Sequence, residues 1–202
     1  MTKWTVANQL TLLRMALIPA FVILVVYGKP GWALVTFGVA GVTDGLDGLI
    51  ARRAGQKTSL GAWLDPMADK LLLVTTFVVL TVPGTDLVNR FPFWLTILVI
   101  TRDVVIVTTV AIVTAVLGVR TFQPSIFGKA ATGVYVVTCV VLMWFNYLGR
   151  TSILVDVGIW ASLVITLVSG FHYIAHAARI INAPSAPAAG EKKTNATGPA
   201  GQ

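Results

Sequence analysis

The segment DGLDGLIARRAGQKTSLGAWLDPMADK, residues 44–70, places four aspartates between two strongly apolar stretches of the chain. Only eight of the 202 residues are acidic, so half of the acidic charge lies in this segment. Asp44 and Asp47 are three residues apart, and Asp65 and Asp69 are four apart, spacings that place each pair on one face of a helix. The segment therefore predicts two antiparallel helices that present paired carboxylates to each other across a short connection.

The composition of the chain indicates that these helices lie in a membrane. The sequence is 56% hydrophobic and 11% charged, whereas soluble domains are roughly 25% charged. Its net charge of +7 is dispersed between apolar runs, which favours loops beside an anionic membrane surface over a face that binds nucleic acid. Six apolar windows, each near the ~20 residues that a helix needs to cross a bilayer, occupy residues 10–28, 31–51, 60–82, 91–118, 126–148 and 152–178. We predict an all-α integral membrane protein with six transmembrane helices.

The two ends of the chain differ from these windows. Residues 1–9 are short and mixed in character, and they predict an N-terminal juxtamembrane helix on the membrane surface. Residues 1–182 form the predicted membrane domain, and residues 183–202, rich in Ala, Pro and Gly, predict a disordered cytoplasmic tail. With both termini in the cytoplasm, ten lysines and arginines lie on that side and three on the other. This bias predicts a multi-pass protein of the cell inner membrane, with its termini and aspartates facing the cytoplasm.

A cluster of four carboxylates needs a counter-charge. One charged residue at membrane depth costs ~2.5–3.5 kcal/mol on insertion scales, before repulsion between like charges is added. Hard oxygen ligands suit Mg²⁺ or Mn²⁺, and two such ions bridging a diphosphate are a common arrangement for in-line displacement. Gly45, Gly48 and Gly61 leave space beside the cluster, either for a bulky ligand or for close helix packing.

The same segment resembles the signature of the CDP-alcohol phosphotransferase family, also called the class I CDP-alcohol phosphatidyltransferases. The matching positions are Asp44-x2-Asp47-Gly48-x2-Ala51-Arg52-x8-Gly61-x3-Asp65-x3-Asp69. The resemblance implies an enzyme that cleaves the phosphoanhydride of a CDP-alcohol, transfers the phosphoalcohol to an acceptor hydroxyl and releases CMP. It also implies a homodimer.

The resemblance further implies roles for single residues. Asp44, Asp47, Asp65 and Asp69 would ligate two divalent ions, Mg²⁺ or Mn²⁺, and Asp69 would also be the base that takes the acceptor's proton. The implied contacts to the CDP moiety are Asn8, Gly48, Arg52 and Thr58. Asn8 lies in ANQLTLLR, residues 7–14, which resembles the N-terminal segment of members that use CDP-diacylglycerol; it could equally cap a helix.

The acceptor is indicated by two further stretches. Residues 61–73 and 125–134 resemble the branch that makes phosphatidylglycerophosphate from sn-glycerol 3-phosphate, an anion that needs positive charge. Arg102, Arg120 and Lys129 are the available groups for its phosphate. The alternatives are a cardiolipin synthase that uses phosphatidylglycerol, an inositol phosphate acceptor and, in another class, a cation-coupled transporter.

One departure from that branch concerns the acceptor directly. Arg102 is followed by Asp103, whereas the branch usually has Arg-Glu; Arg-Asp resembles the eukaryotic-type cardiolipin synthases of the same family. Ionisable residues inside an apolar helix are usually functional, although a structural ion pair to another helix is the alternative. Because neighbouring residues do not face each other on a helix, the spacing predicts separate partners for Arg102 and Asp103.

Overall fold

The structure, a computed structural model, describes residues 6–54, 59–117 and 126–181 of the 202-residue chain. All regular structure in these ranges is helical, as predicted. The six helices are α1 (Val6–Val26), α2 (Pro30–Ala54), α3 (Ser59–Val79), α4 (Phe93–Leu117), α5 (Ile126–Tyr147) and α6 (Ile153–Ile181). Each helix coincides with one of the six apolar windows.

The beginning of α1 corrects one prediction. A separate surface helix is predicted over residues 1–9, but residues 6–9 form the first turn of α1, which continues without a break to Val26. Nothing in the chain forces a break after residue 9, because Gln9, Leu10 and Thr11 all tolerate helical backbone. Residues 1–5 and the predicted tail at 183–202 lie outside the described residues.

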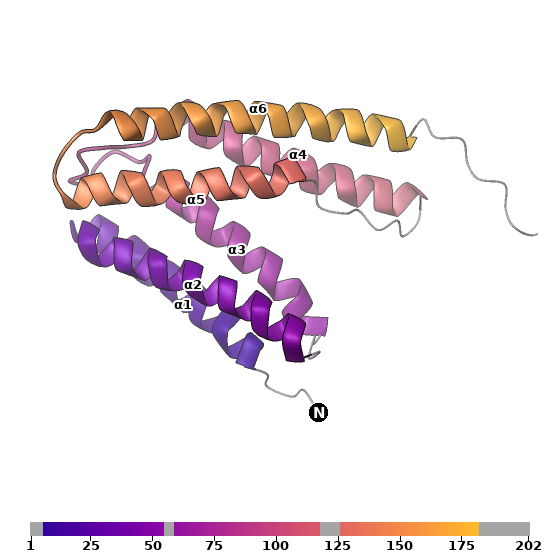
Figure 1. The fold of residues 1–202 in the computed structure, drawn as a ribbon, viewed down its shortest axis with the longest axis horizontal. Coiled ribbons are helices and arrows are strands. Elements are labelled where there is room, and N and C mark those ends of the chain that lie inside the picture. The colour runs from indigo at the N-terminus through magenta and orange to yellow at the C-terminus, as the bar shows by residue number, and fades with distance from the viewer. Residues whose placement is uncertain (1–5, 55–58, 118–125, 182–202) are drawn as a thin grey trace, which may run out of the picture.

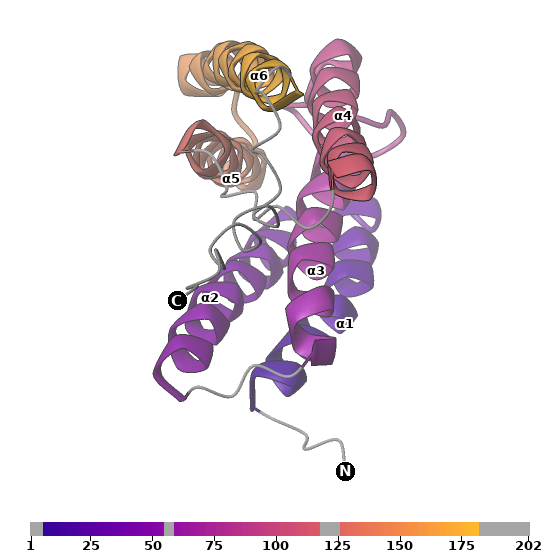
Figure 2. The same cartoon turned by 90° about the vertical axis from the view of Figure 1, so that its right-hand side faces the viewer.

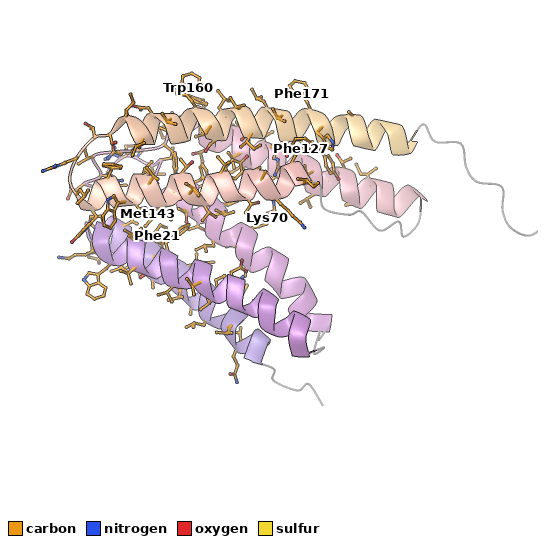
Figure 3. All side chains as sticks on the ribbon, viewed as in Figure 1. Phe21, Lys70, Phe127, Met143, Trp160 and Phe171 are labelled. Atoms are coloured by element: carbon orange, nitrogen blue, oxygen red, sulfur yellow. The ribbon has the colours of Figure 1, made fainter. Side chains whose placement is uncertain are left out.

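Helices of this chain have the length and character of membrane-embedded segments. Gln9–Val26, Ile126–Tyr147 and Ile153–Tyr173 are long and apolar enough to cross a bilayer, among the residues that the structure describes. Large apolar side chains also remain exposed: Trp160 and Phe171 project outward from α6 (Figure 3), with 61% and 71% of their surface accessible. Such contiguous apolar exposure is unfavourable in water and suits contact with lipid.

The helices form two groups that meet at one end. Helices α1, α2 and α3 make up the first group, in which α1 packs against both others. The second group contains α4, α5 and α6, with α6 packed on both α4 and α5 (Figure 2). Helix α5 joins the groups by packing on α2. Figure 1 shows that the groups diverge toward the end where α2 finishes and α3 begins, and that α1 starts and α6 finishes at this same end.

The apolar core lies in the opposite half of the molecule, where the groups meet. Phe77 of α3 stacks on Phe91 at a centroid distance of 4.6 Å and meets the ring of Tyr135 edge-on at 5.5 Å. All three side chains are almost completely buried. Membrane helices gain little from hydrophobic association within lipid, so close packing of this kind supplies much of their attraction.

A polar latch closes the same end of the molecule. The amide of the Asn146 side chain donates to the carbonyl of Asn89 at 2.9 Å, and the Asn146 Oδ1 accepts from the backbone N–H of Asn89 at 2.7 Å. The Asn89 side chain in turn donates to the carbonyl of Arg150 at 2.7 Å. These bonds satisfy buried polar groups and fix the connection between α3 and α4 on the end of α5.

Helices α5 and α6 are in close contact at Gly158. A Cβ atom built on Gly158 would lie 2.8 Å from Cγ2 of Thr138. Thr138 cannot easily move aside, because it is β-branched and its hydroxyl donates to the carbonyl of Val134 at 2.8 Å. Gly133 on α5, in contrast, has open space where its Cβ would be.

We expect Gly158→Ala to lower the stability of the protein by about 1–3 kcal/mol, because the added methyl group overpacks the contact with Thr138. Gly133→Ala is the matched control: it brings the same gain in helix propensity, about 1 kcal/mol, without the clash. Thermal unfolding of both variants in detergent, followed by tryptophan fluorescence, measures the difference. Equal melting temperatures would show that the close approach of α5 and α6 is absent.

Candidate functional site

Both aspartate pairs lie on α2 and α3, which follow one another in the chain. Asp44 and Asp47 are in the second half of α2, Asp65 is in the first half of α3, and Asp69 is at the midpoint of α3. Both helices pack along α1 (Figure 1). The side chains of Asp47, Asp65 and Asp69 lie outside those that the structure describes, so the convergence of all four carboxylates stays a prediction.

Asp44, the one member of the set with a described side chain, is paired with an arginine of α1. Nη1 of Arg14 lies 2.6 Å from Oδ1 of Asp44. The Arg14 side chain is completely buried, whereas 42% of the Asp44 side chain is exposed. The carboxylate of Asp44 is thus paired with a buried cation on one side, and part of its side chain remains exposed.

Sequence reasoning missed this role of Arg14. In the sequence, Arg14 is only an interruption of the first apolar window, and no spacing connects it to Asp44. A signal was nevertheless present, because a buried arginine in an apolar helix is costly unless a carboxylate or another acceptor pairs with it. Few carboxylates are available in this chain, and four of the eight lie at the predicted site.

Asp44, the predicted metal ligand whose side chain is described, suits a hard cation. Asp44 offers an accessible carboxylate oxygen, the ligand type that Mg²⁺ and Mn²⁺ prefer. Within the described side chains, no group of three or more His, Cys, Asp and Glu residues could hold an ion. The side chains of Asp47, Asp65 and Asp69, the other three predicted ligands, lie outside the described part of the chain.

The predicted CDP contacts are placed only in part. Asn8 lies inside the first turn of α1, two residues after its beginning at Val6, so it is not the residue that caps the helix. Gly48 and Arg52 follow the first aspartate pair on α2. The side chains of these residues, and all of Thr58, lie outside the described part of the chain.

A second polar group lies on α4, and it corrects the prediction that Arg102 and Asp103 have separate partners. Nη1 of Arg102 donates to Oδ1 of Asp103 at 2.7 Å. The arginine side chain is long enough to fold back toward its neighbour, although the two Cβ atoms point in different directions. Arg102 also donates through Nη2 to the hydroxyl of Ser169 on α6, and Asp103 also pairs with Lys70 of α3.

The line Lys70–Asp103–Arg102–Ser169, which we call the polar network, therefore connects α3, α4 and α6. Lys70, labelled in Figure 3, directly follows Asp69 in the chain. The network thus reaches the turn of α3 that carries the predicted base. It is part-buried, with 9% of the Arg102 side chain and 17% of the Asp103 side chain exposed.

Arg102 also lines a cavity of about 220 Å³ between α4 and α6. The remaining walls are mainly apolar and include Val105, Leu167 and Phe171. These three side chains are largely exposed at the outer surface, so the cavity opens sideways between the helices. A buried guanidinium beside apolar walls can bind a molecule that has both an anionic or polar oxygen and a hydrocarbon chain.

The other two predicted phosphate contacts are less well defined. Lys129 lies exposed near the beginning of α5. Within the described residues, Lys129 makes no hydrogen bond or ion pair with the polar network. Arg120 lies outside the described residues. The structure therefore defines Arg102 but does not bring the three basic residues together.

Comparison with known proteins identifies the sequence family. Residues 4–168 match the CDP-alcohol phosphatidyltransferase family. A probable phosphatidylglycerophosphate synthase of Mycobacterium tuberculosis is 33% identical over 183 residues, which cover 87% of this chain and 82% of the relative. A cardiolipin synthase (CMP-forming) of Streptomyces coelicolor is 37% identical over 63% of this chain and 60% of its own length. The human cardiolipin synthase (CMP-forming) is 42% identical over 53% of this chain and 34% of its own length.

We expect Arg14 and Asp44 to be energetically coupled, because Nη1 of the fully buried Arg14 lies 2.6 Å from Oδ1 of Asp44. A double-mutant cycle with Arg14→Met, Asp44→Asn and the double variant, measured by unfolding in detergent, should give a coupling of about 0.5–3 kcal/mol. Asp156, exposed on α6, supplies the control: Arg14→Met and Asp156→Asn should add within about 0.5 kcal/mol. Additive effects of the Arg14 and Asp44 substitutions would contradict the pairing.

Proposed function

Because the chain belongs to the CDP-alcohol phosphatidyltransferase family, we propose that it transfers the phosphatidyl group of CDP-diacylglycerol to sn-glycerol 3-phosphate, giving phosphatidylglycerophosphate and CMP. The observation that carries this proposal is the position of the two aspartate pairs on the successive helices α2 and α3. The choice of acceptor is supported by the similarity to the mycobacterial phosphatidylglycerophosphate synthase, which extends over most of both chains.

The proposed reaction is an in-line displacement at phosphorus. The acceptor's hydroxyl oxygen forms a bond to the phosphorus of the phosphatidyl group, and the anhydride bond of CDP-diacylglycerol breaks. CMP leaves with the bonding electron pair. The proton of the hydroxyl passes to the carboxylate of Asp69, and such general-base assistance typically contributes about 10²–10⁴-fold to the rate.

The other predicted site residues would bind the metal ions, the CDP moiety or the acceptor. Asp44, Asp47 and Asp65, with Asp69, would hold two Mg²⁺ or Mn²⁺ ions, whose chemistry is to neutralise the diphosphate as negative charge moves onto the leaving CMP. Asn8, Gly48, Arg52 and Thr58 would bind the CDP moiety. Arg102, Arg120 and Lys129 would bind the phosphate of the acceptor. Arg14 holds Asp44 in place and offsets part of the negative charge of the cluster.

A second candidate, a cardiolipin synthase with phosphatidylglycerol as the acceptor, is favoured by a different observation. Arg102 lines a cavity with apolar walls that opens sideways between α4 and α6. A lipid acceptor could place its phosphate near Arg102 and a hydrocarbon chain along these walls. Several relatives with partial coverage are cardiolipin synthases.

We also propose the arrangement in the membrane. All six helices would cross the bilayer of the cell inner membrane, with the aspartates, both termini and the tail on the cytoplasmic side. The first turn of α1 and the last turn of α6 lie at the end where α2 finishes and α3 begins, which supports this orientation (Figure 1). The active form would be a homodimer, as the family resemblance implies.

The experiment that tests the function is CMP release by the purified protein in detergent, with CDP-diacylglycerol as the donor. Glycerol 3-phosphate, phosphatidylglycerol and inositol phosphate are supplied in separate reactions, and the lipid products are identified. We expect release with glycerol 3-phosphate, loss of release on chelation with EDTA and recovery with Mg²⁺ or Mn²⁺. Release with phosphatidylglycerol alone would establish the second candidate, and no release with any acceptor would contradict the choice of donor.

We expect Asp69→Asn to reduce turnover by at least about 10²-fold, because the amide cannot accept the proton of the acceptor. Binding of CDP-diacylglycerol should largely remain. Asp44→Asn should weaken metal-dependent donor binding as well, and Asp156→Asn on α6 is the control that should change neither. Near-normal CMP release by Asp69→Asn would exclude this residue as the base.

A further inference from the structure

The guanidinium of Arg102 is held at both of its terminal nitrogens by neighbouring side chains. Nη1 donates to Asp103 at 2.7 Å, and Nη2 donates to the hydroxyl of Ser169. Asp103 belongs to the same helix as Arg102, whereas Ser169 belongs to α6 and is 1% exposed. A flexible side chain is thereby fixed in one orientation from two helices before any ligand binds.

The third nitrogen of the group has no such partner. Nε of Arg102 is buried and makes no hydrogen bond with the part of the chain that the structure describes. An unsatisfied buried donor usually costs about 1–3 kcal/mol, and more when it is charged. Arg102 also lines the cavity between α4 and α6, and a ligand oxygen that entered from this cavity could supply the missing partner.

The local charge fits an anion. Asp103 is shared between two cations, because its Oδ1 accepts from Arg102 and its Oδ2 pairs with Lys70. One carboxylate between two cations leaves the group with a net charge of +1. A phosphate brought against Arg102 would therefore be attracted, and Asp103 would remain neutralised by Lys70.

We propose that Ser169 and Asp103 are positioning residues that clamp Arg102 so that its Nε and the free edge of its guanidinium bind the phosphate of the acceptor. This inference rests on the proposed function, in which Arg102 contacts that phosphate. Glycerol 3-phosphate and phosphatidylglycerol share this chemistry, since each has a phosphate ester on the glycerol that supplies the attacking hydroxyl.

The clamp also sets where the acceptor's phosphate lies relative to the predicted base. Lys70 directly follows Asp69 on α3, and its ion pair with Asp103 links this turn of α3 to α4. A phosphate held by Arg102 is therefore placed relative to the helix that carries Asp69. Such positioning aligns the reacting groups before reaction, an effect that remote contacts commonly supply in enzymes.

The clamp is tested with Ser169→Ala and Asp103→Asn, and the matched control is Ser162→Ala. Ser162 is a fully buried serine on the same helix, and its hydroxyl lies 3.2 Å from that of Thr138, outside the polar network. The KM for acceptor, the KM for CDP-diacylglycerol and kcat are measured in parallel with glycerol 3-phosphate and with phosphatidylglycerol. The acceptor that supports turnover in these two assays shows whether the bound phosphate belongs to glycerol 3-phosphate or to phosphatidylglycerol.

We expect Ser169→Ala and Asp103→Asn each to raise the KM for acceptor by about tenfold, the effect of losing one hydrogen bond to a charged group. The KM for the donor should not change, and Ser162→Ala should leave both constants unchanged. Asp103→Glu, which retains the charge, should recover most of the acceptor affinity. Binding of the acceptor without donor, measured by calorimetry, should weaken by the same factor as the KM rises.

Two outcomes separate the clamp from the function on which it rests. Arg102→Lys removes the planar fork of donors. If this variant leaves the KM for acceptor unchanged, the proposed contact with phosphate is wrong, and the proposed clamp is overturned as well. If Arg102→Lys raises this KM but Ser169→Ala and Asp103→Asn do not, the contact stands and the clamp is overturned. Equal losses of kcat in Ser169→Ala and Ser162→Ala, without a change in KM, would also overturn it.

Discussion

The arrangement of this protein depends on the rule that a charge placed among apolar helices must have a partner before those helices can pack. Arg14 is completely buried, so α1 can lie against α2 only with a carboxylate beside that guanidinium. Asp44 supplies the carboxylate and keeps 42% of its side chain exposed. One interaction therefore has two results: it places a carboxylate beside the buried cation, and it fixes a carboxylate that stays partly exposed at the surface.

The same rule applies to α4, where one carboxylate lies between two cations. Asp103 lies between Arg102 and Lys70, and Arg102 reaches Ser169 on α6. Charged and polar groups of three helices thus satisfy one another across their interfaces. Nε of Arg102 is buried and has no hydrogen-bond partner in the described structure. Helix α3 contributes to both regions, because it packs on α1, which carries Arg14, and itself carries Lys70.

The sequence predicts the helices well and the contacts between them poorly. All six helices coincide with apolar windows, because the length and the apolar character of a run are local properties of a segment. The spacing of the aspartates likewise predicts that each pair is helical. The start of α1 differs from the prediction because the composition of residues 6–9 does not distinguish a surface helix from the first turn of a longer one.

Contacts between helices have no comparable local signal. Arg14 and Asp44 are 30 residues apart, and their pairing follows from how α1 packs on α2. The expectation of separate partners for Arg102 and Asp103 considers the directions of the Cβ atoms but not the reach of the arginine side chain. Ser169 has no distinguishing spacing, since a single serine in an apolar helix is common in membrane proteins. Its significance depends on Arg102, which is 67 residues away in the chain.

The latch between Asn89 and Asn146 lies at the end of the molecule opposite to the end where α2 finishes and α3 begins, and this position has a mechanical consequence. The helix groups are fastened together where they meet and diverge toward the end where α2 finishes (Figure 1). A 25-residue helix is about 37 Å long, so a rotation of about 5° at the fastened end displaces its far end by about 3 Å. If the helices rotate as rigid bodies about the latch, a slight repacking around Asn146 would produce a displacement at the other end comparable to the width of a hydroxyl group.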